Sequence, residues 1–423
     1  MSGPNLQTFD VAVLGGGPAG MAAALAARRQ GASVALIERE ERLGGILKQC
    51  IHDGFGLVRF GRKMAGPEYA QHFIDQVAES DIRVWCSSFV YRVQPQPGGG
   101  VLLGLVTAAG MKEIAARALV LATGCRERTA RQVAIHGTRP AGVYTAGAAQ
   151  HYTNLLGKLP GRRCVVLGSG DIGLIMARRL TLEGAKVLGV YEAKPTPSGL
   201  RRNISQCLED FDIPLYTGRT VTRTFGAQRL EAVEVCRVDE AMRPIDGTQQ
   251  RIACDCLILS VGLIPENELA EALGVELDGA TRGPVCDQNG QTLVNGVFCC
   301  GNALHVNDLV DYVSESGEAA GAAAAGAAAP RRLARVQAGQ GLLYCVPQRL
   351  DLAAPLQKTV LYFRSRAERG KTLLRVTAGG RELYRRTYRA LRPPEMERLC
   401  IDLSGAGLTE ADCLNITLSE VNG

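Results

Sequence analysis

Hydrophobic and polar positions in the first three quarters of the chain follow a repeated order of elements. An apolar run at residues 9–14 precedes a Gly-rich turn, an Ala-rich helical stretch and a second apolar run at residues 33–38. The same strand, turn, helix and strand order returns at residues 163–192. Each segment has about the length of one βαβ unit, the building block of a doubly wound parallel sheet. The pattern predicts an α/β protein with two Rossmann-like dinucleotide-binding domains.

Shorter apolar runs predict further strands outside these two units. They lie at residues 83–93, 101–107, 118–123, 232–238, 256–261 and 296–300. A helix is expected from about Leu309 onward, and the Ala-rich run at residues 319–329 is its end. Glycines interrupt that run and Pro330 closes it, so no stretch of the chain is expected to cross a membrane.

The pattern changes at about residue 341. Short alternating or β-branched runs separated by turn residues then continue to the end of the chain, without a phosphate-binding turn. This texture is typical of a small all-β sandwich. We therefore expect residues 1–155 and 286–330 to form the first Rossmann-like domain, residues 156–285 the second, residues 330–340 a linker, and residues 341–423 the sandwich.

Composition narrows the class of partner. The net charge of +6 in 423 residues is mild, and no basic block carries interleaved aromatics, so nucleic acid is not an expected partner. No export leader is apparent, and the 14 scattered cysteines are expected to be reduced thiols in a cytoplasm. The spacing of these cysteines does not indicate a zinc or iron–sulfur site.

The first Gly-x-Gly-x-x-Gly fingerprint consists of Gly15, Gly17 and Gly20. The first glycine permits the tight turn, the second lets a pyrophosphate approach the backbone, and the third lets helix and strand pack closely. Glu38 ends the second strand, where an acid can bind a ribose diol. The alternative is a Gly-rich turn without a ligand, but the strand before it, the helix after it and the acid beyond all favour a dinucleotide.

The second fingerprint consists of Gly168, Gly170 and Gly173, with Glu192 at the end of the following strand. An acid at this position favours NAD, because a carboxylate repels the additional phosphate of NADP. Three nearby cations could serve that phosphate instead: Lys194, Arg201 and Arg202. An empty second Rossmann unit, kept only for packing, is the remaining alternative.

Two complete fingerprints in one chain resemble the two-dinucleotide flavoproteins related to the pyridine-nucleotide–disulfide oxidoreductases, over residues 8–330. The resemblance implies FAD in the first site and NAD(P)H in the second. Three further pieces match the family: the Gly44–Gly45 pair, the strand end Ala122–Thr123–Gly124, and Gly301. The family has Asp after that last glycine, whereas this chain has Asn302, which can donate and accept hydrogen bonds but brings no charge.

A closer resemblance lies in the stretch at residues 122–152, which is similar to the FAD/NAD-binding subunits of sarcosine, opine and cyanide-forming glycine oxidoreductases. Residues 44–57, 262–270 and 301–318 resemble bacterial flavoproteins that accompany a glycerol-3-phosphate dehydrogenase-like protein and a small Cys-rich protein. These matches imply a subunit of an electron-transfer assembly.

The fingerprints and the resemblance together predict one set of cofactor-binding residues: Gly15, Gly17, Pro18, Ala19, Gly20, Glu38, Arg39, Gly44, Gly45, Val90, Ala122, Thr123, Gly124, Gly168, Gly170, Asp171, Gly173, Glu192, Gly262, Gly301 and Asn302.

The sequence offers fewer candidate residues for the redox chemistry than for cofactor binding. The flavin and nicotinamide carry the redox step, and the protein supplies orientation and electrostatics. The dithiol of a disulfide reductase is not in the expected segments. Cys50 is a single thiol that the family geometry places near the flavin, and it is either a redox thiol or a packing residue. His52 and His305 are candidate acid–base groups, with a structural role as the alternative.

Three functions remain open on the sequence. The first is an FAD-dependent, NAD(P)H-linked electron-transfer subunit that works with a partner dehydrogenase. Assembly of the chain into a homo-oligomer is compatible with this function. The second is a self-contained NADH oxidase or peroxidase that uses Cys50. The third is an assembly component in which FAD is structural.

Overall fold

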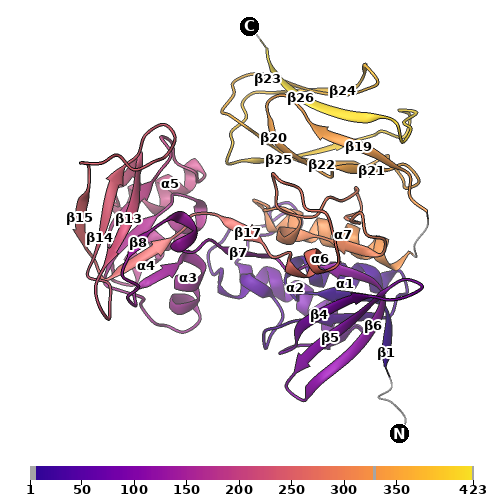
Figure 1. Ribbon diagram of the computed structural model, residues 1–423, viewed down its shortest axis with the longest axis horizontal. Coiled ribbons are helices and arrows are strands. Elements are labelled where there is room, and N and C mark those ends of the chain that lie inside the picture. Colours follow the sequence, from indigo (N-terminus) through magenta and orange to yellow (C-terminus); the bar gives the residue numbers. More distant parts are fainter. Residues whose placement is uncertain (1–5, 327–329, 422–423) are drawn as a thin grey trace. The chain divides into compact units, whose positions relative to one another are not determined.

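The computed structural model describes residues 6–326 and 330–421, and it divides into two compact units (Figure 1). Unit 1 comprises Met1–Cys125 and Pro265–Gly423, and unit 2 comprises Arg126–Ile264. The last three residues of the expected Ala-rich run, 327–329, lie outside the described residues. No helix in the described part of the chain is long and apolar enough to span a membrane.

The main sheet of unit 1 has the order β3-β2-β1-β6-β5-β4, with β18 paired to β6. Its strands are β1 (Gln7–Leu14), β2 (Val34–Ile37), β3 (Arg83–Trp85), β4 (Phe89–Pro95), β5 (Val101–Thr107), β6 (Gly110–Leu121) and β18 (Val297–Cys299). The strands β3, β2, β1, β6 and β18 are mutually parallel, while β4 and β5 form an antiparallel extension. The last four residues of β1 are buried, as expected for a strand covered on both faces.

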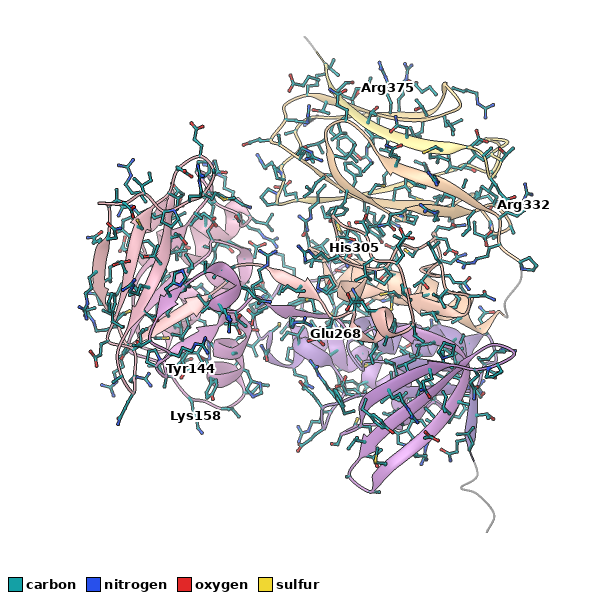
Figure 2. The ribbon with its side chains drawn as sticks, in the orientation of Figure 1. Tyr144, Lys158, Glu268, His305, Arg332 and Arg375 are labelled. Atoms are coloured by element: carbon teal, nitrogen blue, oxygen red, sulfur yellow. The ribbon has the colours of Figure 1, made fainter. Side chains whose placement is uncertain are left out.

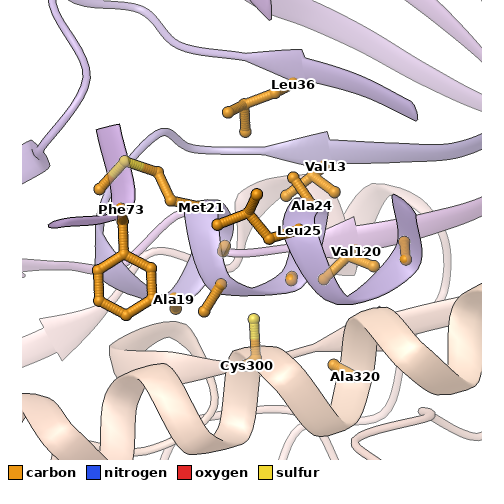
Figure 3. Packing of buried hydrophobic residues seen from close by; sticks show 14 of the residues in the cluster. Val13, Ala19, Met21, Ala24, Leu25, Leu36, Phe73, Val120, Cys300 and Ala320 are labelled. Atoms are coloured by element: carbon orange, nitrogen blue, oxygen red, sulfur yellow. The ribbon is translucent and has the colours of Figure 1, made fainter. Parts of the chain in front are cut away.

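Helices α1 (Pro18–Arg29), α2 (Gly66–Ala78) and α7 (Val310–Ala325) pack against this sheet, and the short helices η1 (Gly45–Gln49), η4 (Gly301–Ala303) and α6 (Glu268–Ala272) lie in its connections. Small residues let α1 and α7 approach closely. A Cβ at Gly317 would lie 2.2 Å from the carbonyl oxygen of Ala19, and one at Gly321 would lie 2.0 Å from that of Ala23. Figure 3 shows Ala19, Cys300 and Ala320 in this packed layer. The Ala- and Gly-rich composition of α7 therefore serves a close helix crossing.

Unit 2 contains a five-stranded parallel sheet of order β12-β11-β10-β16-β9 and a four-stranded sheet of order β15-β14-β13-β8. The strands are β8 (His136–Gly137), β9 (Val143–Thr145), β10 (Arg163–Leu167), β11 (Lys186–Glu192), β12 (Leu215–Thr217), β13 (Arg219–Phe225), β14 (Ala232–Arg237), β15 (Gln250–Ala253) and β16 (Cys256–Leu259). The helices are α3 (Ala146–Asn154), α4 (Asp171–Leu182), α5 (Arg201–Cys207), η2 (Arg131–Val133) and η3 (Glu209–Phe211). Strands β7 (Cys125–Glu127) and β17 (Leu263–Pro265) pair where the chain passes between units.

The unit boundaries differ from the expected positions at residues 155 and 285. Unit 2 begins earlier because β9 pairs with β16 and so joins the second parallel sheet. It also ends earlier, because Leu273, Val275 and Cys286 belong to the core of the first sheet together with Leu119. Tertiary pairing that the local pattern does not reveal sets both boundaries.

The C-terminal β region (residues 333–420) contains two sheets, β21-β19-β26-β23-β24 and β20-β22-β25, around a shared core. Its strands are β19 (Leu333–Ala338), β20 (Leu342–Val346), β21 (Arg349–Asp351), β22 (Thr359–Ser365), β23 (Thr372–Ala378), β24 (Arg381–Tyr388), β25 (Met396–Ile401) and β26 (Cys413–Glu420). Residues 330–340 were expected to form a linker, but most of this range forms the strand β19. Ala334 and Val336 are buried, and this strand pairs with β21 and β26.

The β region is packed firmly on the rest of unit 1. Tyr344, Tyr362 and Met396 share a hydrophobic cluster with Leu304 and other residues of the first sheet's core. Glu315 of α7 accepts hydrogen bonds from the Tyr362 hydroxyl at 2.8 Å and from the Arg398 Nε at 2.8 Å. The region is therefore an integral part of unit 1 and shares its core.

Candidate functional site

The first glycine turn connects β1 to α1. Gly15 has φ +108°, and a Cβ at Gly20 would lie 1.7 Å from the Gly15 carbonyl oxygen, so both positions require glycine. Gly17 is the N-cap of α1 and Pro18 follows at the first helical position. A Cβ at Gly17 would meet nothing nearer than the Cα of Gly45, at 3.9 Å. The protein thus leaves space before the helix N-terminus, where backbone N–H groups can bind phosphate.

Glu38 follows β2 and is buried beside this turn. Its Oε2 accepts the Gly16 N–H at 2.7 Å and its Oε1 accepts the Glu40 N–H at 2.8 Å. A carboxylate has about four lone-pair positions, so about two remain for a ribose diol. The Gly44 N–H donates to the Gly16 carbonyl at 2.8 Å, which holds the Gly44–Gly45 segment against the turn.

The strand end after β6 also reaches this turn. The Ala122 N–H donates to the Leu14 carbonyl at 2.9 Å. Thr123 Oγ1 donates to the Glu266 carbonyl at 2.6 Å, and the Glu266 N–H donates to the Gly124 carbonyl at 3.0 Å. Segments that are far apart in sequence are therefore fixed together at the carboxyl edge of the first sheet, where doubly wound folds bind ligands.

Two further predicted residues, Arg39 and Val90, make contacts within the protein. Arg39 forms an ion pair with Glu266 at 3.3 Å. Val90 lies in β4 with 9% of its surface exposed, opposite Leu105 of β5. Neither observation assigns a contact to a cofactor.

Gly301 and Asn302 lie in η4, close to the same turn. A Cβ at Gly301 would be 2.7 Å from the Cβ of Ala19, so the η4 backbone lies against the start of α1. Asn302 Oδ1 accepts the Asn307 N–H at 3.0 Å, and Asn302 Nδ2 lies 3.6 Å from the Cys125 sulfur. Cys125 was not among the residues expected at this site. Its position directly after the Ala122–Gly124 strand end was the available signal.

The second glycine turn lies in unit 2 and repeats the geometry of the first. A Cβ at Gly168 would lie 1.9 Å from the Ser260 carbonyl oxygen, and one at Gly173 would lie 2.7 Å from the Gly168 carbonyl oxygen. Gly170, the N-cap of α4, again faces space, because its Cβ would meet nothing nearer than Ser260 Oγ at 3.6 Å. Both turns thus fit a dinucleotide pyrophosphate, each at a helix N-terminus.

The polar groups around this second turn are occupied within unit 2. Glu192 is buried, and its carboxylate accepts hydrogen bonds from Ser169, Lys194 and Ser198. Asp171 Oδ1 accepts the Leu200 N–H at 2.9 Å and Asn203 Nδ2 at 2.7 Å. Arg201 and Arg202 begin α5 with exposed side chains, and the Gly262 carbonyl accepts the Arg128 N–H at 3.0 Å.

Cys50 directly follows η1. Its thiol donates to the Ile46 carbonyl at 3.3 Å, and burial raises its pKa to about 12. A thiol with this pKa is protonated at neutral pH, whereas nucleophilic and redox cysteines act as thiolates. No disulfide bond links the cysteines that the structure describes. The environment of Cys50 favours packing over a redox role.

His305 follows η4 and is 1% exposed. Its ring lies 5.2 Å from the Tyr362 ring and 6.2 Å from the Tyr344 ring, beneath the C-terminal β region (Figure 2). Burial, together with the Arg364 guanidinium, lowers the pKa of His305 to about 4. The imidazole is therefore neutral near pH 7 and shielded from solvent, which favours a packing role over acid–base catalysis. His52, by contrast, is partly exposed, with Nδ1 3.0 Å from the Asp53 carbonyl oxygen.

Comparison with protein families identifies one match over most of the chain. The profile described as pyridine nucleotide-disulphide oxidoreductase matches residues 9–329, about three quarters of the chain. Among solved structures, the crystal structure of T. acidophilum thioredoxin reductase has a TM-score of 0.62 at 22% identity, covering 76% of this chain and 98% of that one. At this identity the likeness shows the fold alone, an α/β fold with Rossmann-like sheets.

Curated relatives match the same part of the chain. An opine oxidase subunit of Agrobacterium tumefaciens (strain Ach5) is 26% identical over 317 residues, covering 70% of this chain and 62% of the relative. Hydrogen cyanide synthase subunit HcnB of Pseudomonas protegens is 28% identical over 293 residues, covering 64% of this chain and 60% of the relative. The matches thus span about 60% of the length of these relatives.

Proposed function

This chain belongs to the pyridine nucleotide-disulphide oxidoreductase family, and we propose that it is an electron-transfer subunit linking NAD(H) and FAD to a partner dehydrogenase. It is an FAD-dependent pyridine nucleotide oxidoreductase that uses FAD and a nicotinamide cofactor. The observation that carries the finer proposal is the combination of two glycine turns open to phosphate with a single thiol, Cys50, in the segment that follows Gly45.

The first turn is the proposed FAD site. Backbone N–H groups at the start of α1 hold the pyrophosphate in front of Gly17, and Glu38 accepts the ribose hydroxyls with its remaining lone pairs. Asn302 is held by the Asn307 backbone beside α1 and offers its amide to the ribityl chain. The bound flavin and nicotinamide supply the hydride transfer itself.

The second turn is the proposed nicotinamide dinucleotide site. Gly170 leaves space for the pyrophosphate at the start of α4, and Glu192 lies buried at the end of β11. We assign NAD as the preferred form, because a carboxylate at this position repels a 2′-phosphate. Lys194, Arg201 and Arg202 are the exposed cations that would reverse this preference.

The route by which electrons leave the flavin supports a partner protein. A self-contained disulfide reductase passes electrons to a dithiol beside its flavin, but Cys50 is the single cysteine of that segment and is protonated at neutral pH. The opine oxidase and hydrogen cyanide synthase relatives are both named as subunits. We infer from these two observations that electrons leave for, or arrive from, another polypeptide.

The C-terminal β region is the proposed docking surface for that polypeptide. Residues 331–423 carry sixteen Lys and Arg against nine Asp and Glu, a net +7 in a chain whose total is +6. Arg375 of β23 stands directly opposite Arg385 of β24, and like charges in this position destabilise a sheet. Glu382 lies 3.5 Å from Arg375 Nε and 3.7 Å from Arg385 Nε, so it offsets one of the two charges. A partner with an acidic surface would compensate the charge that remains.

Figure 2 shows Arg375 on the side of the β region away from α7. The opposite sheet, which holds Tyr344 and Tyr362, is packed on the core of unit 1. Removal of the whole region would therefore expose apolar core residues and confuse docking with stability. Charge removal by Arg375→Gln with Arg385→Gln tests docking without touching that core and without placing like charges opposite each other beside Glu382.

The experiment uses the full FAD-loaded chain and its candidate partners, a glycerol-3-phosphate dehydrogenase-like protein and a small Cys-rich protein. NADH should bleach the flavin faster than NADPH in anaerobic stopped flow. The Arg375→Gln, Arg385→Gln variant should bleach at the same rate but lose partner-dependent turnover. Bleaching by neither nucleotide would contradict the nicotinamide assignment, and unchanged partner-dependent turnover in the variant would contradict the docking surface.

A further inference from the structure

The two acids that follow the glycine turns differ in how fully the protein itself occupies them. Glu38 accepts one backbone N–H on each oxygen, from Gly16 and Glu40. Glu192 accepts four donors. Its Oε2 accepts Ser169 Oγ at 2.6 Å, the Ser169 N–H at 3.1 Å and Ser198 Oγ at 3.2 Å, and its Oε1 accepts the Lys194 N–H at 3.0 Å. Each carboxylate oxygen offers about two lone-pair positions, so Oε2 is fully occupied by the protein, whereas Oε1 keeps about one position for a ribose hydroxyl.

The additional donors have two sources. The middle residue of the first turn is Gly16, but the corresponding residue of the second turn is Ser169, whose hydroxyl reaches Glu192 from within the turn. The second source is Ser198, in the loop at residues 193–200 between β11 and α5. The Ser198 N–H also donates to Ser169 Oγ at 2.8 Å. Both serine hydroxyls therefore donate to Oε2, one of the two carboxylate oxygens that could accept a ribose hydroxyl.

The loop at residues 193–200 is held in this place by contacts on its other side. The Leu200 N–H and Asn203 Nδ2 both donate to Asp171 Oδ1, at 2.9 and 2.7 Å. A Cβ at Gly199 would lie 2.7 Å from the Ser169 carbonyl oxygen and 3.0 Å from Asp171 Oδ1. The loop backbone thus lies directly against the glycine turn.

We propose that the Ser198 hydroxyl competes with the adenosine ribose of the nicotinamide dinucleotide for Glu192, and so sets the affinity of the second site. Ser169 belongs to the turn and keeps its hydrogen bond, whereas Ser198 lies on the loop and makes the longest bond to Oε2. Dinucleotide binding is then an exchange in which one ribose hydroxyl replaces Ser198 on Oε2. The apparent affinity is therefore the intrinsic affinity multiplied by the fraction of molecules in which Ser198 has left Glu192.

This inference rests on the proposed nicotinamide role of the second turn and adds a residue that governs it. It also bears on specificity. Once Ser198 has left, the Glu192 carboxylate is exposed to the ribose, where it accepts a 2′-hydroxyl but repels a 2′-phosphate. Loss of the Ser198 hydrogen bond to Glu192 should therefore raise the affinity for a dinucleotide with a free 2′-hydroxyl, but not for one with a 2′-phosphate.

The test measures binding by calorimetry on the full, FAD-loaded chain, with ADP-ribose and 2′-phospho-ADP-ribose as probes, since neither exchanges electrons with the flavin. Ser198→Ala should bind ADP-ribose up to about tenfold more tightly than the parent chain, because one competing hydrogen bond of about 1.4 kcal/mol is removed. Ser198→Thr retains a hydroxyl and should bind like the parent. Thr196→Ala changes an exposed residue of the same loop and is the matched control.

Melting temperatures of all variants separate a change in binding from a loss of folding. Equal ADP-ribose affinity in the parent and Ser198→Ala, or weaker binding in the variant, would overturn the inference while leaving the proposed function intact. An equal gain for 2′-phospho-ADP-ribose would overturn the assigned role of Glu192 in selection. If no variant binds either probe, both the inference and the nicotinamide assignment of the second turn fail.

Discussion

Gly317→Ala should weaken both the stability of unit 1 and its hold on FAD. The new Cβ would lie 2.2 Å from the carbonyl oxygen of Ala19, in the first turn of α1, and real Cβ atoms do not approach heavy atoms closer than 3.0 Å. Helix α7 must therefore retreat, or α1 must move, by about 0.8 Å at this crossing. The first turn of α1 carries the N–H groups proposed to hold the FAD pyrophosphate, so the shift reaches the site directly.

The magnitude follows from two opposing effects. Overpacking costs roughly 1–3 kcal/mol. The replacement of a mid-helix glycine by alanine returns about 1 kcal/mol of helix propensity. We expect a net loss of about 1 kcal/mol in the free energy of unfolding, and a FAD dissociation constant raised about tenfold by misaligned N–H groups.

Thermal melting and flavin retention on gel filtration measure these two effects. Gly326→Ala is the matched control, because Gly326 caps the same helix with φ −83° and its Cβ would meet nothing nearer than 3.5 Å. That variant should keep its flavin and melt at or above the parent temperature. If Gly317→Ala behaves like Gly326→Ala, the proposed coupling between the helix crossing and the FAD site is wrong.

Three further outcomes are expected. Gly17→Val should abolish FAD retention, seen as loss of flavin absorbance after purification, because its side chain would fill the open space before α1; a yellow variant would contradict this. Arg331→Ala should lower the free energy of unfolding by about 3 kcal/mol, since it leaves the 1% exposed carboxylate of Asp287 without its guanidinium. Burial raises the pKa of Asp287 above its ordinary 3.8, which means that the folded state favours the protonated carboxyl group. The loss of unfolding free energy caused by Arg331→Ala should therefore be larger at pH 8 than at pH 5. Chemical denaturation at both pH values checks this direction. Cys50→Ser should leave the rate of flavin bleaching by NADH unchanged within about twofold, because the thiol is protonated at neutral pH; a large loss in stopped flow would restore its redox role.

Local sequence patterns predicted the two Rossmann units because each is encoded within about thirty residues. Strands β1, β10 and their glycine turns lie where the apolar runs placed them. The strand β19 was missed, although Ala334 and Val336 alternate with polar residues, because its partners β21 and β26 follow later in the chain. The start of unit 2 was misplaced for the same reason, since β9 belongs with the distant strand β16.

The same distinction between local and long-range structure decides which features of the sites could be predicted. Glycine spacing located both turns, since the geometry of each turn is local. Burial of His305 beneath Tyr344 and Tyr362 could not be read from the neighbours of His305, because both tyrosines lie about forty residues or more beyond it. The occupation of Glu192 Oε2 by Ser198 likewise depends on where the loop carrying Ser198 folds.

The most direct test of the central claim follows the flavin through one full cycle. The FAD-loaded chain is reduced with one equivalent of NADH under anaerobic conditions, and reoxidation is then recorded with air alone and with the candidate partner proteins. The account predicts rapid bleaching, slow recovery in air, and recovery accelerated by a partner. Fast recovery in air that no partner changes would contradict it and identify an oxidase instead.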